Sequence, residues 1–283
     1  MHADNLTIGI VGLGLIGGSI AKAFRENTSH RVLGYDLSEK TLSSAVFCSA
    51  IEENLEGKYS ECDIIVMALY PKDTVEFVET HAKEFKAGSI VTDCSGVKSF
   101  VCESLAKTGR ENGFYFIGGH PMAGIERSGF GYSRPDMFKN ASMILTPPED
   151  TPKEKIDLLW SVFSRLGFTH LELTTPEEHD KMIAFTSQLA HVVSSAYIMS
   201  PSALNHFGFS AGSFKDMTRV ARLNEYMWTE LFLENKEYLS LELDGLIDRL
   251  EQFSKAVKTA DRNTLFNLLK TGREHKEESE RLG

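Results

Sequence analysis

The sequence has few cysteines and no paired cysteine motif. Its four cysteines are Cys48, Cys62, Cys94 and Cys102. None belongs to a C-x-x-C pair and no histidine cluster lies beside them, so we expect no zinc or other metal site. We expect reduced thiols in a cytoplasmic protein. The first residues also lack a basic stretch, so we expect no signal peptide there.

Long apolar runs and basic runs are also missing. The longest apolar run, residues 64–70, is far too short to cross a bilayer. Thirty Lys and Arg against 40 Asp and Glu give a formal net charge of −10, which a phosphate backbone would repel. We therefore expect neither a membrane nor a nucleic acid as partner. Hydrophobic residues make up 42% of the chain, which excludes disorder as its dominant state.

Proline and glycine become scarce after Pro176. Seven of the eight prolines lie at or before Pro176, and only five of the 22 glycines follow it. Before this point, short β-branched runs alternate with amphipathic stretches, which predicts a mostly parallel sheet with crossover helices. Strands are expected at residues 7–11, 31–35, 63–69, 89–92, 114–118, 143–146 and 169–173, and helices at 15–25, 39–47 and 153–165.

The remainder of the chain predicts helices throughout. One apolar stripe at helical spacing is formed by Leu239, Leu243, Leu246, Leu250, Phe253 and Val257. Such a stripe is either intrachain core or a surface that meets a second copy of the chain. We predict an α/β protein with an N-terminal Rossmann-type, mostly parallel sheet (1–174), followed by an all-helical C-terminal domain (175–283) for substrate binding and homodimerisation.

A glycine-rich turn directly follows the first predicted strand. Gly12, Gly14 and Gly17 form G-x-G-x-x-G, which allows a tight turn and a close approach of a pyrophosphate to a helix N-terminus. Asp36 lies 19 residues after Gly17, where a carboxylate accepts hydrogen bonds from ribose hydroxyls and repels a 2′-phosphate. This favours NAD over NADP as the ligand of the turn. The alternative is a glycine-rich turn that binds no ligand. The expected cofactor-binding residues are Gly12, Gly14, Leu15, Ile16, Gly17, Asp36 and Ser95.

A second polar cluster is predicted where two strands end. Residues 92–98 and 118–126 each leave a predicted strand, and ligands gather at such ends in open α/β sheets. His120, in a turn shaped by glycine and proline, is placed to meet a nicotinamide ring and to take a proton as an alcohol is oxidised. Ser95 could hydrogen-bond the same hydroxyl or the cofactor. Lys98 is equally a surface charge or a helix-start residue.

Three segments carry a family resemblance: GLGLIGGS, DCSGVK and GGHPMAGIERSGF. They resemble the prephenate dehydrogenase family of tyrosine biosynthesis, which includes arogenate-using and dual-specificity cyclohexadienyl dehydrogenases. The H-P-M-A-G run, followed by Glu and Ser-Gly, is the most specific part. The similarity continues through EHD, SQLAH and FKDMTRVA, with Gln188 and Ala190 in place of the family's usual His and Pro. It implies conversion of prephenate and NAD⁺ to 4-hydroxyphenylpyruvate, CO₂ and NADH.

The resemblance also implies roles for individual residues. His120 would take the proton of the ring hydroxyl, and Ser95 would orient His120 or that hydroxyl. The implied substrate-binding residues are Arg219, His191, Ser187, Glu126, Asp216, Gly212 and Trp228. Arg219 would bind a substrate carboxylate. Asp216, three residues earlier on a predicted helix, would orient the Arg219 guanidinium; the alternative is that the two form an ordinary helical salt bridge. Gly212 and Trp228 match family positions that reach a neighbouring subunit's site.

Other functions stay open at this point. Arogenate is the alternative substrate, since the sequence assigns no carboxylate to its ammonium group and so does not separate it from prephenate. A β-hydroxyacid dehydrogenase, an imine reductase and a non-catalytic NAD-binding protein are further alternatives. We expect no small regulatory domain, so any inhibition by tyrosine is expected at the active site.

Overall fold

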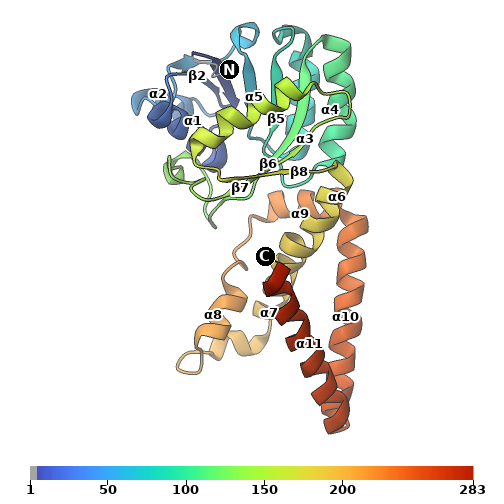
Figure 1. The fold of residues 1–283 in the computed structure, drawn as a ribbon. Coiled ribbons are helices and arrows are strands. Elements are labelled where there is room, and N and C mark those ends of the chain that lie inside the picture. The colour runs from blue at the N-terminus through green and yellow to red at the C-terminus, as the bar shows by residue number, and fades with distance from the viewer. Residues whose placement is uncertain (1–4, 283) are drawn as a thin grey trace. The chain divides into compact units, whose positions relative to one another are not determined.

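The computed structural model describes residues 5–282, whose strands form an eight-stranded sheet (Figure 1). The strand order is β3-β2-β1-β4-β5-β6-β7-β8, and every neighbouring pair is parallel except β6 and β7. The strands are β1 (Thr7–Val11), β2 (Arg31–Tyr35), β3 (Glu53–Asn54), β4 (Ile64–Met67), β5 (Ile90–Asp93), β6 (Tyr115–Pro121), β7 (Ser142–Thr146) and β8 (His170–Leu173). The predicted Rossmann-type, mostly parallel sheet is confirmed.

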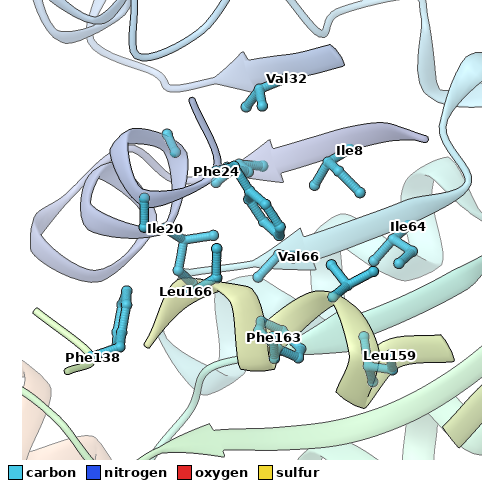
Figure 2. Close-up of a cluster of buried hydrophobic side chains, with 14 of the residues drawn as sticks. Ile8, Ile20, Phe24, Val32, Ile64, Val66, Phe138, Leu159, Phe163 and Leu166 are labelled. Atoms are coloured by element: carbon cyan, nitrogen blue, oxygen red, sulfur yellow. The ribbon is translucent and has the colours of Figure 1, made fainter. Parts of the chain in front are cut away.

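Helices cover both faces of this sheet because its strands are apolar on both sides. The helices are α1 (Leu15–Asn27), α2 (Glu39–Phe47), α3 (Pro71–His81), α4 (Ser99–Asn112) and α5 (Lys153–Phe163). Ile64 and Val66 pack with side chains of α1 and α5, as Figure 2 shows. Ile65 and Met67 point the other way and pack with α3 and α4. Because β1, β4 and β5 are parallel neighbours, their carboxyl ends meet at one edge of the sheet.

A series of helices follows the last strand, as predicted. Thr175 begins it by accepting a hydrogen bond from the N–H of Glu178, and Pro176 occupies the first helical turn. The helices are α6 (Pro176–Ile183), a π-helical segment (Ala184–Leu189), α7 (Ala190–Ile198), α8 (Gly212–Thr218) and α9 (Glu225–Glu234). Short 3₁₀ turns occur at η1 (Tyr59–Glu61), η2 (Ala82–Glu84), η3 (Phe130–Tyr132), η4 (Ser164–Leu166) and η6 (Pro201–Asn205).

The chain divides into two compact units, Met1–Asn235 and Lys236–Gly283. The second unit holds α10 (Lys236–Lys258) and α11 (Arg262–Leu282), which contact each other across a short turn. In that turn Asp261 accepts a hydrogen bond from the N–H of Thr264 at 3.0 Å, which caps α11. The domain boundary expected between residues 174 and 175 stays a prediction. Among the described residues, no helix combines the length and apolar character needed to span a membrane.

Candidate active site

The glycine turn between β1 and α1 is fixed by close backbone packing. Gly12 has a φ of +88° and donates its N–H to the carbonyl of Tyr35 at 2.8 Å. A Cβ at Gly17 would lie 1.9 Å from the carbonyl oxygen of Gly12. Any larger residue at position 17 would therefore push α1 away from the turn.

The outer side of this turn is open, which suits a dinucleotide. A Cβ at Gly14 would meet nothing within 4 Å, and α1 begins there with no side-chain cap and no acidic residue in its first turn. The first N–H groups of α1, from Leu15 and Ile16 onward, can thus bind a pyrophosphate. Asp36 reaches the same turn, where it accepts a hydrogen bond from the N–H of Leu13 at 2.9 Å. It accepts a second one, also at 2.9 Å, from the N–H of Ser38 at the start of α2. The remaining lone pairs of the Asp36 carboxylate can accept hydrogen bonds from ribose hydroxyls. The glycine turn and Asp36 therefore fit NAD.

Asp93, buried at the end of β5, joins two segments of the site. One of its carboxylate oxygens accepts from the N–H of Ser95 and the other from the N–H of Gly119, both at 2.9 Å. Lys98 is completely buried, forms an ion pair with Asp93 and donates to the carbonyl of Gly119 at 2.7 Å. Lys98 immediately precedes α4, so the helix-start interpretation holds and the surface-charge interpretation is wrong. This network holds Ser95 beside the residues that lead into His120.

Ser95 carries a buried hydroxyl that no described residue satisfies. The residue is 4% exposed, and its Oγ has no hydrogen-bond partner among the described residues. Buried polar groups are nearly always paired in folded proteins, and those that are not commonly await a ligand or water. Ser95 therefore offers a free donor and acceptor, in the segment that Asp93 links to Gly119 of β6.

His120 lies within β6, not in a turn after it as the sequence predicted. Parallel pairing of β6 with β5 ends at the pair Thr92 and Ile117, but antiparallel pairing with β7 continues and sets His120 opposite Ile144. This second partner extends the strand to Pro121. The imidazole is therefore carried by regular backbone, which restricts its position more than a turn would.

A chain of polar contacts starts at the His120 side chain. Its Nδ1 lies 2.8 Å from Nε2 of His179, and Nδ1 of His179 lies 2.7 Å from Oδ1 of Asp180. Burial, together with the nearby His179 and Lys98, lowers the pKa of His120 well below its usual 6.5. His120 is therefore neutral near pH 7 and can accept a proton. The sequence had indicated His179 and Asp180 only as a family motif without a role; an adjacent His-Asp pair in the first turns of a helix was the available signal.

Arg219, the residue after α8, pairs with Glu126. Its Nη1 lies 2.7 Å from Oε1 of Glu126, and the two side chains are 68% and 39% exposed, so the pair contributes less than about 1 kcal/mol. In the described chain, no ion pair joins Asp216 to Arg219, so the expectation that Asp216 holds Arg219 is wrong for this conformation. Arg219 follows the last residue of a short helix, and its side chain extends to the loop after β6 instead of back along α8.

His191 and Ser187 are joined through the backbone and not through the serine hydroxyl. Nδ1 of His191 lies 2.8 Å from the carbonyl oxygen of Ser187, which is in the π-helical segment. Trp228 of α9 stacks on His191 with ring centroids 3.9 Å apart. Trp228 thus contacts a predicted substrate residue of its own chain. Gly212 is the exposed first residue of α8, and a Cβ there would meet nothing within 4 Å.

No cluster of three or more His, Cys, Asp or Glu side chains in residues 5–282 is arranged to hold a metal ion. The candidate site residues are those of a nucleotide turn (Gly12–Gly17 with Asp36), a neutral imidazole (His120), a buried unpartnered hydroxyl (Ser95) and an exposed guanidinium (Arg219). A dinucleotide turn, a base, a hydroxyl and a cation are the groups that the oxidation of an anionic alcohol requires.

Comparison with known proteins identifies the family of this chain. Residues 20–171 match the family model described as prephenate dehydrogenase, nucleotide-binding domain, and residues 175–271 match prephenate dehydrogenase, dimerization domain. A prephenate dehydrogenase of Bacillus subtilis (strain 168) is 29% identical over 281 residues, which cover 96% of this chain and 75% of that protein.

Solved structures give the same result. Prephenate dehydrogenase from A. aeolicus, in complex with hydroxyphenyl propionate and NAD⁺, has a TM-score of 0.86 at 28% identity and covers 98% of this chain and 99% of that one. Synechocystis arogenate dehydrogenase has a TM-score of 0.81 at 28% identity and covers 97% of this chain and 100% of that one. The nucleotide-binding model alone spans more than half of the residues, and the chain therefore belongs to the prephenate dehydrogenase family.

Proposed function

We propose that this chain oxidises prephenate with NAD⁺ and releases CO₂, giving 4-hydroxyphenylpyruvate. The observation that carries the proposal is the buried carboxylate of Asp93, which binds the N–H of Ser95, whose hydroxyl is unpartnered, and the N–H of Gly119, which precedes the neutral His120, in a chain of the prephenate dehydrogenase family. The B. subtilis relative is named for this substrate. Membership of the family argues against a β-hydroxyacid dehydrogenase, an imine reductase or a non-catalytic protein.

The cofactor of this NAD-dependent oxidoreductase would be held by the glycine turn. The N–H groups that begin α1 would bind the pyrophosphate, and Asp36 would accept the ribose hydroxyls. NAD⁺, when bound, supplies the acceptor for the hydride that leaves the carbon bearing the ring hydroxyl. A carboxylate at position 36 repels the 2′-phosphate of NADP, which supports NAD as the cofactor.

His120 would take the hydroxyl proton as the C–H bond breaks and the C=O bond forms. Loss of CO₂ then leaves its bonding electron pair in the ring, which becomes aromatic, and the resulting phenolate oxygen takes a proton back. The protein supplies no net proton, because the one that His120 removes is returned at the end. Ser95 would hydrogen-bond the same oxygen or orient the nicotinamide.

Arg219 would bind a carboxylate of the dianionic substrate. Its guanidinium is largely exposed and is held by Glu126, which would have to share it or release it when substrate arrives. The weakness of this exposed pair supports that exchange. Ser187, His191, Trp228 and Gly212 would complete the substrate cavity, as the family resemblance implies.

The chain would act as a homodimer through its helical part. Residues 175–271 match a dimerization domain, and large apolar side chains of α10 and α11 are exposed. They include Leu241, Ile247, Leu250, Val257, Phe266 and Leu269. Sedimentation equilibrium would show twice the chain mass if the proposal holds and a monomer at micromolar concentration if it does not. A cytoplasmic location fits the four free thiols and stays a prediction.

A direct assay tests the activity. The purified full-length chain is mixed with NAD⁺ and either prephenate or arogenate, and NADH absorbance and released CO₂ are followed. We expect prephenate to be oxidised with a higher kcat/KM than arogenate, and NAD⁺ to be used in preference to NADP⁺. The absence of NADH formation with prephenate, or a clear preference for arogenate, would contradict the proposal.

A further inference from the structure

Three side chains from two distant segments of the chain form a continuous line of hydrogen bonds: His120 of β6, and the adjacent His179 and Asp180 of α6. We propose that His179 and Asp180 are positioning residues, which hold the proton of His120 on Nδ1, aim its Nε2 at the substrate hydroxyl, and share the positive charge when His120 becomes protonated. The chemical part of this inference rests on the function proposed above.

Asp180 is the anchor of the line. Its Oδ1 accepts a hydrogen bond from the backbone N–H of Lys98 at 2.7 Å, and its Oδ2 accepts one from the N–H of Ser99 at 2.8 Å. These are the first N–H groups of α4, so the positive end of that helix faces the carboxylate. Burial alone would raise the pKa of Asp180, but the hydrogen bonds from His179 and Ser99 outweigh burial and lower the pKa. Asp180 is therefore ionised and can only accept hydrogen bonds.

An ionised Asp180 dictates where each histidine carries its proton. His179 must donate from Nδ1, because Asp180 offers no hydrogen in return. Burial lowers the pKa of His179 in spite of the hydrogen bond to Asp180, so His179 is neutral and its Nε2 has a lone pair. His120 must then donate from Nδ1 to that nitrogen across 2.8 Å. The lone pair of His120 is thereby placed on Nε2, where a base is needed.

The same line accommodates the proton during turnover. When the substrate hydroxyl gives its proton to Nε2 of His120, the Nδ1 proton of His120 can move toward Nε2 of His179, and the resulting positive charge comes within reach of the Asp180 carboxylate. When the phenolate forms, the protons move back and the three side chains return to their starting state. No oxidant, reductant or additional acid is required.

The other charges around the line do not replace Asp180. Lys98 and Asp93, from the β5–α4 side, are paired with each other. Lys98 disfavours a charge on either histidine. Asp180 and Asp93 favour a charge on His179, and Asp180 is the carboxylate in contact with it. Removal of His179 therefore isolates His120 from the one carboxylate that supports its protonated form through the line.

The test compares His179→Ala with His179→Gln. A glutamine amide has an acceptor and a donor spaced much like the two ring nitrogens, so it can bridge His120 and Asp180, whereas alanine cannot. We expect His179→Ala to lower kcat roughly 100-fold, the lower end of what an acid–base group contributes, with KM for prephenate changed less than about threefold. We expect His179→Gln to stay within about tenfold of the wild-type kcat. The control is His170→Ala, an exposed histidine on β8, which should leave kcat unchanged.

A second readout needs no substrate. In the ¹⁵N-labelled protein without ligands, imidazole NMR correlations identify which nitrogen of His120 carries the proton, with His120→Asn used for assignment. We expect a protonated Nδ1 in the wild type and in His179→Gln, and loss of this preference in His179→Ala. The proposal is overturned if His179→Ala keeps the Nδ1 proton, keeps kcat within about threefold, or loses no more activity than His179→Gln. Failure of the wild type to oxidise prephenate would instead refute the proposed function, while the NMR result would still decide the proton position.

Discussion

Replacement of His120 by asparagine separates its role as a base from its role in the hydrogen-bonded line. The Nδ2 of asparagine lies about where Nδ1 of histidine lies, so it can still donate to His179, which is 2.8 Å away in the wild type. Only Nε2 is lost. A lost acid–base group lowers the rate roughly 10²- to 10⁴-fold, and even the smaller figure raises the activation barrier by about 2.7 kcal/mol.

The assay is initial-rate NADH formation with saturating prephenate and NAD⁺. We expect kcat of His120→Asn to fall at least about 100-fold, while NAD⁺ affinity and Tm stay close to wild type because the neighbouring contacts remain. His170→Asn, on the exposed edge of β8, is the matched control and should behave as wild type. A His120→Asn enzyme with near-normal turnover would refute the assignment of His120 as the base.

Three further predictions concern cofactor, substrate and acid stability. Asp36→Ala should reduce the preference for NAD⁺ over NADP⁺ roughly tenfold, about 1.4 kcal/mol, and an unchanged ratio of kcat/KM values would show that Asp36 does not select the ribose. Arg219→Ala should raise KM for prephenate roughly 10- to 100-fold, since a hydrogen bond to a charged group contributes about 1.5–3 kcal/mol, and should leave NAD⁺ affinity unchanged. The control is Arg222→Ala, at an exposed arginine, and an equal loss of both affinities in Arg219→Ala would indicate a damaged fold. The free energy of unfolding should fall as pH drops below about 6.5, because folding lowers the pKa of His120 and His179 and the unfolded chain therefore protonates both imidazoles first. Each histidine lowers the free energy of unfolding by up to about 1.4 kcal/mol per pH unit. A Tm that is equal at pH 7.5 and pH 5.5 would contradict this.

The regular elements of the sheet could be predicted because their signals are local. The run Ile64–Met67 is apolar throughout, and the glycines of the first turn are needed for backbone reasons that depend on few other residues. All seven predicted strands form, two with the predicted ends and five with end shifts of up to three residues. The position of Asp36 beside the glycine turn was equally predictable, since parallel neighbours bring their carboxyl ends together.

The contacts that the sequence did not reveal are those between distant segments. Lys98 is buried only because Asp93 and the carbonyl of Gly119 satisfy its ammonium group, and Gly119 belongs to a different strand. The strand position of His120 depends on β7, which pairs with β6 more than 20 residues later in the chain. The partner of Arg219 is Glu126, 93 residues away, and not the nearby Asp216. Patterns within a short window contain no information on such partners.

The burial of Asp180 against the start of α4 limits how the enzyme can open. Pulling α6 away would leave a carboxylate and two amide groups without partners in an apolar setting, which is unfavourable by several kcal/mol. The contact between Glu126 and Arg219 is exposed, and the free energy needed to separate the two side chains is small. Of these two contacts, the one between Arg219 and Glu126 therefore separates far more readily than the one that joins α6 to α4.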